Sequence, residues 1–211
     1  RLDEARKLIA DNAAIDPLAI ANRYEAQQLA PSDANKAALT AALNHKFNNY
    51  LALAEPYIKA GQYEEARDII GAFDGQQPLK DYYQAVLSAK LGDMKSAETY
   101  AKQGANGNPD YVFPNRLYDV VVLKAIIAEH PEDGLAAYYL GNFYYDRKIY
   151  DQATQLWETC VAQNPDYAMA HRNLSIAYFN RQHQPEKALA ELELAFKLDP
   201  TNSRLVFELD T

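Results

Sequence analysis

Small and large apolar residues recur along residues 134–200 in a pattern that occurs twice, in two consecutive copies. The first copy reads GLAAYYLGNFYYDRKIYDQATQLWETCVAQNP and the second reads AMAHRNLSIAYFNRQHQPEKALAELELAFKLDP. Each copy predicts a helix, a turn and a second helix. The matching positions are Leu140 with Leu174, Gly141 with Ser175, Tyr144 with Tyr178, Ala153 with Ala188, Trp157 with Leu192, Cys160 with Ala195, and Pro165 with Pro200. The first pair is separated by 34 residues and the last by 35.

The pattern has a direct physical meaning. We expect Gly141 and Ser175 to be small because a neighbouring helix crosses closely there, and the same holds for Ala153 and Ala188 on the second helix of each copy. Large residues such as Trp157 fill the space around these crossings. A unit of this kind cannot bury its apolar face alone, so neighbouring units must stack on it.

The period and these residue types resemble the tetratricopeptide repeat (TPR) family. The resemblance implies an all-α fold, a right-handed superhelical solenoid of antiparallel helix pairs, with about 12–13 helices. It also implies that the first helices of successive pairs line a concave face.

A second regularity extends the repeat toward the N-terminus. An alanine stands 12 residues before a proline five times. These pairs predict second helices near 2–13, 63–73, 94–104, 150–163 and 185–197. Other helices are expected over 18–29, 34–45, 47–60, 79–91 and about 115–129, with a kink at Pro56 and a turn at Gly61.

The period breaks over residues 110–131, where one helix of a pair is missing or replaced. We therefore divide the chain into four segments. These are divergent helical repeats over 1–108, an irregular linker and helix over 109–132, two well-formed repeats over 133–200, and the start of a truncated capping helix over 201–211.

Composition narrows the function classes. The 211 residues carry 29 acidic and 21 basic side chains, and this net charge of −8 argues against general binding to nucleic acid or to anionic membranes. The longest aliphatic run, Val120–Leu123, is far too short to cross a bilayer. A single cysteine excludes an intramolecular disulfide. We expect a cytoplasmic location, although the first residue is Arg1, so an upstream segment that held a signal peptide is an open alternative.

A narrower resemblance covers residues 109–209. The run PDYVFPNRLYDVVVLKAIIAEHP and the repeats after it are similar to the C-terminal tail of a bacterial multidomain family. In that family an N-terminal β-rich domain, similar to sugar mutarotases and of unknown function, precedes helical repeats. The resemblance implies that this chain is the repeat portion of a longer protein, and it transfers no catalytic residue.

Catalytic chemistry is sparse in the repeats. Cys160 occupies a position where the repeat needs a small buried residue, so we expect an inert thiol. The four histidines lack the spacing of metal ligands. We predict no catalytic residue, no metal site and no cofactor, and we expect this chain not to be an enzyme.

The candidate site is a groove on the first helices. The residues expected to face it are Tyr138, Asn142, Tyr145, Asp146, Met169, Arg172, Ile176, Phe179 and Asn180. Leu51, Glu55 and Ile58 would extend it toward the N-terminus. Such a mixture suits a peptide, since aromatic residues supply contact area while arginine and asparagine supply directional hydrogen bonds. The alternative is that Arg172 pairs with Asp146 and only holds neighbouring repeats in register.

One known mode of TPR binding does not fit. The resemblance to chaperone-binding TPR domains implies a carboxylate clamp of lysine, asparagine and arginine side chains. Asn142 matches the asparagine of that clamp, but Tyr138 stands where its first lysine would be.

Three functions follow from these observations. The first is a non-enzymatic interaction or assembly scaffold that binds a protein or peptide partner, the adjoining β domain being one such partner. The second is a helical accessory to a carbohydrate-active protein whose catalytic or sugar-binding domain lies upstream. The third is weak homo-oligomerisation.

Overall fold

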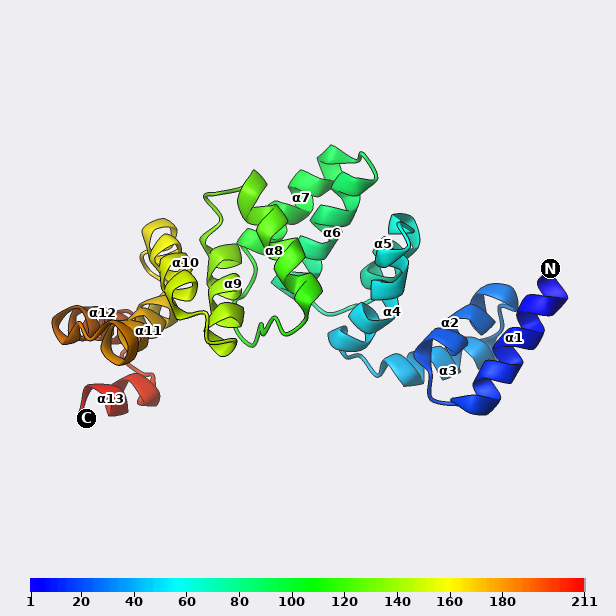
Figure 1. The fold of residues 1–211 in the computed structure, drawn as a ribbon, viewed down its shortest axis with the longest axis horizontal. Helices are drawn as coiled ribbons and strands as arrows, with labels where there is room; N and C mark the ends of the chain where they lie inside the picture. The colour runs from blue at the N-terminus through cyan, green and yellow to red at the C-terminus, as the bar shows by residue number, and fades with distance from the viewer. Residues whose placement is uncertain (211) are drawn as a thin grey trace. The chain divides into compact units, whose positions relative to one another are not determined.

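The computed structural model describes residues 1–210, which form thirteen α-helices and one π-helical turn without any β-strand (Figure 1). The helices are α1 (Leu2–Ile15), α2 (Ile20–Leu29), α3 (Asp33–Leu43), α4 (Phe47–Lys59), α5 (Tyr63–Gly71), α6 (Pro78–Lys90), α7 (Met94–Ala105), α8 (Leu117–Glu129), α9 (Gly134–Asp146), α10 (Tyr150–Gln163), α11 (Ala168–Ala177), α12 (Pro185–Leu198) and α13 (Ser203–Leu209). The π turn spans Tyr178–Gln182. The predicted all-α fold class is confirmed, and the predicted terminal segment 201–211 corresponds to α13, apart from Thr211, which lies outside the described residues.

The described chain divides into two compact units. Unit 1 contains residues 1–76 with 87–93, and unit 2 contains residues 77–86 with the chain from Met94 onward. Helix α6 therefore contributes residues to both units. Within each unit, helices that follow one another in sequence pack as antiparallel pairs, such as α4 with α5 and α9 with α10 (Figure 1).

The core of unit 1 lies between α4 and α5. Its buried residues on α4 include Tyr50, Leu53 and Ala54, and those on α5 include Ile69 and Ile70. Glycine at position 61 adopts a φ of +75°, a left-handed conformation that L-residues rarely accept, and the chain turns there as the sequence predicts. Helix α4 runs through Pro56 and ends three residues later.

Helices α1 and α2 contain no buried residue. Their apolar side chains Leu2, Leu8 and Ile15 are mostly exposed. These helices are therefore held by partial contacts and by side-chain hydrogen bonds. Arg23, for example, donates from its guanidinium to the carbonyls of Pro17 and Ala38.

The alanines of the 12-residue pattern occupy the predicted close crossings in four of five cases. Ala66, Ala97, Ala153 and Ala188 are buried, whereas Ala5 on α1 is only partly buried. The exception follows from the position of α1, which has no buried face. The repeat therefore fixes which helices pack tightly.

Unit 2 has a tyrosine-rich core with buried acids as hydrogen-bond acceptors. The hydroxyl of Tyr82 donates to Asp133 at 2.8 Å, and the hydroxyl of Tyr83 donates to Asp119 at 2.7 Å. Asp133 also caps α9 by accepting the amide N–H of Ala136. Burial raises the pKa of Asp133 above its ordinary value, against the opposing effect of these hydrogen bonds. These two buried tyrosines thus keep their hydroxyls paired, whereas the buried hydroxyl of Tyr139 has no hydrogen-bond partner among the described residues.

The irregular segment contains a single helix. Helix α8 follows a loop after α7 and packs against α9, so it stands between two helix pairs without a sequence partner of its own. The carboxylate of Asp119 on α8 accepts the backbone N–H groups of Asn115 and Arg116 and so fixes the start of the helix. Helix α8 is the one helix that the described chain forms within residues 109–132.

Candidate functional site

The nine residues predicted to face a groove lie on α9, on α11 and on the π turn that continues α11. The helices bring them into one region of unit 2, but their environments differ greatly. Three of them form structural contacts, and the other six keep exposed or partly exposed side chains.

Tyr138 belongs to the core. Only 8% of its surface is exposed, and its ring meets those of Tyr139 and Tyr167 edge-on, the latter with a centroid distance of 4.9 Å. A side chain packed in this way offers a partner very little area. Tyr138 therefore contributes to the packing beneath the predicted surface and not to the surface itself.

Asn142 has a positioning role. Its side-chain oxygen accepts the indole N–H of Trp157 at 3.1 Å and the amide of Asn173 at 3.0 Å. Both lone pairs of that oxygen are used in this arrangement. The residue links α9 to α10 and to α11, and its oxygen is not available to grip a carboxylate or a peptide.

Arg172 forms an ion pair, but not with Asp146. Its guanidinium donates to both carboxylate oxygens of Glu208 on α13, with the Nε to Oε2 distance at 2.8 Å. The proposed pairing with Asp146 is wrong, since Asp146 lies 3.4 Å from the neighbouring Arg147 instead. Arg172 instead joins α11 to α13, through an acid 36 positions further along the chain.

The six remaining candidates keep accessible surface. Tyr145 is partly buried, with its ring 5.0 Å from those of Tyr150 and Trp157. Met169 and Ile176 are also partly buried, whereas Asp146, Phe179 and Asn180 are exposed. The binding role of these residues stays a prediction.

The N-terminal extension of the groove is contradicted. Leu51 and Ile58 are buried in unit 1 with 2% and 4% exposure, and Glu55 forms an ion pair with Lys59 at 2.7 Å. The accessible apolar groups of α4 lie on another side of this helix than Leu51, Glu55 and Ile58.

The π turn explains the extra residue of the second repeat. In the first copy the chain closes its turn with a hydrogen bond from Ile149 N–H to the carbonyl of Tyr144, five residues back. In the second copy the corresponding bond runs from Gln184 N–H to Tyr178, six residues back. A π turn accommodates one residue more than an α turn, which is how a period of 34 residues at Leu174 becomes 35 at Pro200.

This turn also determines what is exposed. Phe179 and Asn180 lie within it, and the phenyl group of Phe179 is 60% exposed. Arg181 folds back onto α10 with its guanidinium 3.9 Å from the ring centroid of Tyr150, a cation–π contact that fixes the turn. The one-residue difference between the two repeats was a signal in the sequence that could have located this feature.

The helix that carries the candidates is anchored by His171. Its Nδ1 lies 2.6 Å from Glu191 and its Nε2 lies 2.8 Å from the carbonyl of Pro165, so both ring nitrogens face acceptors. With its side chain buried, His171 joins α11 to α12 and to the preceding loop. It has no path to a substrate.

The expectation for Cys160 is confirmed. The thiol is fully buried, and burial raises its pKa to about 12, with a smaller contribution from the charge of Asp133. A thiol without appreciable thiolate at neutral pH is a poor nucleophile. Across residues 1–210, no three histidine, cysteine or acidic side chains gather in a way that could hold a metal ion.

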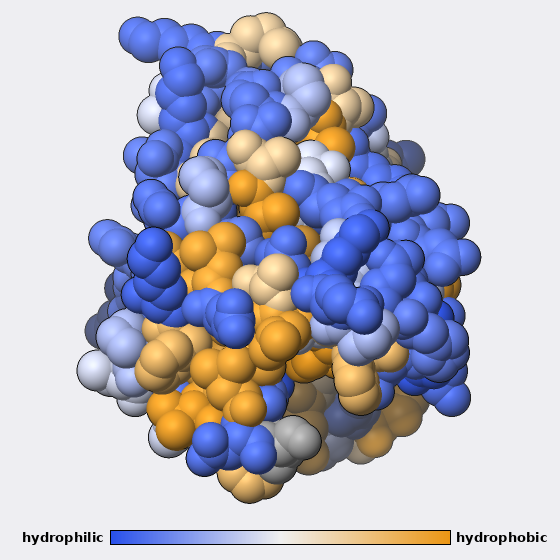
Figure 2. All heavy atoms as spheres, turned by 90° about the vertical axis from the view of Figure 1, so that its left-hand side faces the viewer, coloured by the Kyte–Doolittle hydropathy of each residue, from blue (hydrophilic) through white to orange (hydrophobic). Residues whose placement is uncertain are grey.

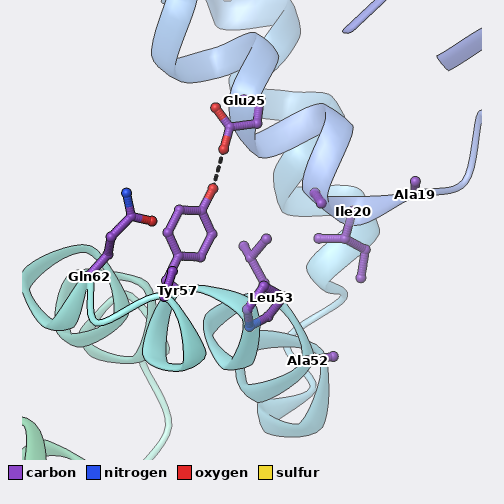
Figure 3. A pocket seen from close by; sticks show the side chains of 10 residues that line it. Ala19, Ile20, Glu25, Ala52, Leu53, Tyr57 and Gln62 are labelled. Atoms are coloured by element: carbon purple, nitrogen blue, oxygen red, sulfur yellow. Dashed lines mark hydrogen bonds between the residues drawn. The ribbon is translucent and has the colours of Figure 1, made fainter. Parts of the chain in front are cut away.

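Sequence reasoning missed a hollow in unit 1. It measures about 580 Å³ and is lined by residues of α2 and α4 (Figure 3), none of which belongs to the nine predicted residues. The two helices that form it are separated by α3 in the chain, so no local pattern could have indicated it.

The chain has some likeness to solved TPR structures. YrrB, a TPR protein with an unusual peptide-binding site, is 16% identical over 96% of this chain and 98% of its own, with a TM-score of 0.42. A MamA double mutant is 22% identical over 77% of this chain and 80% of its own, with a TM-score of 0.44. TTC0263, a TPR protein of Thermus thermophilus, is 18% identical over 78% of this chain and 97% of its own, with a TM-score of 0.40.

No family model matches the chain. With TM-scores below 0.5, the structural similarities do not extend to a partner or a function. In the described residues, no helix is both long and apolar enough to cross a membrane.

Proposed function

We propose that this chain is a non-enzymatic protein-interaction module, and that a peptide segment of its partner binds to α9, α11 and the π turn. The observation that carries the proposal is the exposed pair Phe179 and Asn180, which the π turn presents beside the partly exposed Ile176. An exposed aromatic ring supplies contact area, and the amide of Asn180 has no hydrogen-bond partner among the described residues.

The surroundings of this surface favour binding without rearrangement. The contacts described above fix the side chains of Arg172, Asn142 and Arg181. They join α11 and the π turn that carries Phe179 to the neighbouring helices. A preorganised surface loses less conformational entropy when a partner binds.

A peptide-display selection on the immobilised chain tests the proposal. Binding of each selected peptide is then measured by fluorescence anisotropy for the parent, for a Phe179→Ala, Asn180→Ala variant, and for Met94→Ala as control. Met94 is a matched control because it is also an exposed apolar residue, at 63%, and lies on α7. Arg172 and Asn142 are unsuitable for mutation here, since their loss would disturb the fold.

We expect selected peptides to bind the double variant at least about tenfold more weakly, a loss of about 1.4 kcal/mol, and the control unchanged. Peptides that bind all three proteins equally would contradict the proposed surface. A selection that enriches no peptide would contradict a peptide-binding function.

A second candidate function is self-association through α12 and α13. Leu189, Leu194, Val206 and Phe207 expose apolar surface on these helices. Figure 2 shows hydrophobic atoms gathered on the lower half of the molecular face that α11, α12 and α13 present. An apolar patch of this kind commonly marks an interface. Sedimentation equilibrium of the parent and of a Leu189→Glu, Val206→Glu variant tests it, and a parent that stays monomeric at every concentration contradicts it.

A further inference from the structure

The hollow in unit 1 opens between α2 and α4 (Figure 3). One wall is a stripe along α4 whose residues repeat every four positions, and the other is the start of α2 together with Glu25. The lining residues are Ala19, Ile20, Ala21, Glu25, Ala52, Leu53, Pro56, Tyr57, Ala60 and Gln62. Seven of these ten are alanine, isoleucine, leucine or proline, so the surface is mainly aliphatic.

The stripe has the length of a short peptide. From Ala52 to Ala60 is eight helical residues, or about 12 Å at 1.5 Å per residue. An extended chain advances about 3.3 Å per residue, so roughly four residues of a partner would lie along it. Small side chains at Ala52 and Ala60 let a partner approach the helix backbone closely.

Two polar groups beside the hollow are hydrogen-bond acceptors, and Gln62 adds a side-chain amide that can both donate and accept. Pro56 has no N–H, so the carbonyl of Ala52 lacks the donor that an α-helix normally supplies four residues later. Across the hollow, the hydroxyl of Tyr57 donates to the carboxylate of Glu25 and holds this acid over the aliphatic wall (Figure 3). Both groups favour a partner that brings N–H donors.

Glu25, the one charged side chain among the described residues that line the hollow, is an acid. Burial, followed by the charge of Glu25, raises the pKa of Tyr24, and Glu65 and Asp68 act on it in the same direction. The three acids Glu25, Glu65 and Asp68 form no ion pair among the described residues. Two basic groups of this part of the chain are engaged elsewhere, since Arg23 donates to the carbonyls of Pro17 and Ala38 and Lys59 pairs with Glu55.

From this combination we propose that the hollow between α2 and α4 binds a polypeptide segment in which an aliphatic side chain is flanked by lysine or arginine. The aliphatic side chain packs on Pro56 and Ile20, a basic side chain reaches Glu25, and a backbone N–H of the segment donates to the carbonyl of Ala52. This site goes beyond the proposed function, because it lies in unit 1 and shares no residue with the surface at Phe179.

Chemical-shift mapping on the isotopically labelled full chain tests the proposal. The probes are two capped peptides, Gly-Lys-Leu-Lys-Gly and its acidic counterpart Gly-Glu-Leu-Glu-Gly, which keep the same leucine and reverse the flanking charge. The variants are Glu25→Gln, which removes the charge but retains an acceptor for Tyr57, and Ala52→Phe, which fills the hollow. Glu186→Gln on α12 is the control, as it changes the net charge equally at an exposed position.

We expect the basic probe to shift amide signals of α2 and α4, and the acidic probe to leave them unchanged. Glu25→Gln should weaken binding of the basic probe at least about fivefold, a loss of about 1 kcal/mol, and Glu186→Gln should not. Ala52→Phe should abolish the shifts, and Glu25→Gln carries the test by itself if Ala52→Phe fails to fold.

Several results overturn the proposal. They are the absence of shifts in α2 and α4 at the highest probe concentration, equal binding of the acidic probe, and unchanged affinity in Glu25→Gln. Shifts confined to α11 and the π turn would reject this site while leaving the surface at Phe179 intact.

Discussion

A close helix crossing in unit 2 yields a sharp stability prediction. A Cβ atom at Gly141 would lie 2.5 Å from the Nε1 atom and 2.6 Å from the Cδ1 atom of Trp157, distances that real Cβ atoms do not show. The indole cannot easily move aside. It is 3% exposed, its N–H donates to Asn142, and its ring lies against Tyr145.

The size of the effect follows from two opposing contributions. Gly→Ala inside a helix normally stabilises by about 1 kcal/mol. Here the methyl group forces overpacking, which costs about 1–3 kcal/mol, and it disturbs a buried hydrogen bond worth about 1 kcal/mol. We expect Gly141→Ala to lower the free energy of unfolding by about 1–3 kcal/mol in the parent.

The sign should reverse when the indole is absent. Trp157→Ala alone costs about 3–5 kcal/mol for the lost packing and hydrogen bond. Of the three atoms nearest to the new Cβ, only the carbonyl oxygen of Ala153 remains in that background, at 3.3 Å, a small strain. Gly141→Ala should then be neutral or stabilise by up to about 1 kcal/mol, which gives a coupling energy of about 1–4 kcal/mol.

Urea unfolding followed by helical circular dichroism measures all four proteins. Trp157 is the sole tryptophan, so its fluorescence reports on this crossing in the parent and in Gly141→Ala. Comparing the two signals shows whether the repeats unfold together. The reasoning is refuted if Gly141→Ala changes the stability by the same amount in both backgrounds, within about 0.5 kcal/mol.

Three further predictions concern unit 2. Glu208→Gln should lower the free energy of unfolding by about 1–2 kcal/mol, because the mostly buried Arg172 loses its charged acceptor. Hydrogen exchange of the α13 amides should therefore accelerate, and unchanged exchange would contradict this prediction. Cys160 should resist an aromatic disulfide reagent in the folded protein and react readily in urea, and rapid native modification would disprove its burial. Stability should also fall as the pH rises from 9 toward about 12, because the folded-state pKa of Cys160 is raised from 9.0 to about 12, and this thiol's contribution is complete below pH 9. Cys160→Ala should reduce the slope of that fall by about 1.4 kcal/mol per pH unit, and an unchanged slope would be evidence against the shift.

Much of the helical framework could be predicted from residue spacing. The range 150–163 coincides with α10, and the turn at Gly61 and the small residue at Gly141 have the predicted roles. These features depend on local geometry and on a repeat that specifies each close crossing. The candidate surface was harder to predict, because Tyr138, Asn142 and Arg172 share the face of their helices but not the same degree of exposure.

The reason lies in partners that are distant along the chain. Arg172 is paired by Glu208, 36 residues away, and Asn142 is bonded by Asn173, 31 residues away. A helical pattern shows which way a side chain points, but not whether a group from another helix meets it. The hollow between α2 and α4 has the same origin, since Tyr57 and Glu25 are 32 residues apart.

By itself, the sequence determined the approximate positions of the helices, the pairing of neighbouring helices and the positions where small residues are required, because each depends on short-range periodicity. It also contained one extra residue in the second repeat. Only the tertiary structure decided that this residue is absorbed in a π turn, because packing of Tyr178 and Ala188 fixes both ends of the segment and leaves the turn to take up the difference. The same packing leaves Phe179 exposed, and that exposure is the physical basis of the proposed interaction surface.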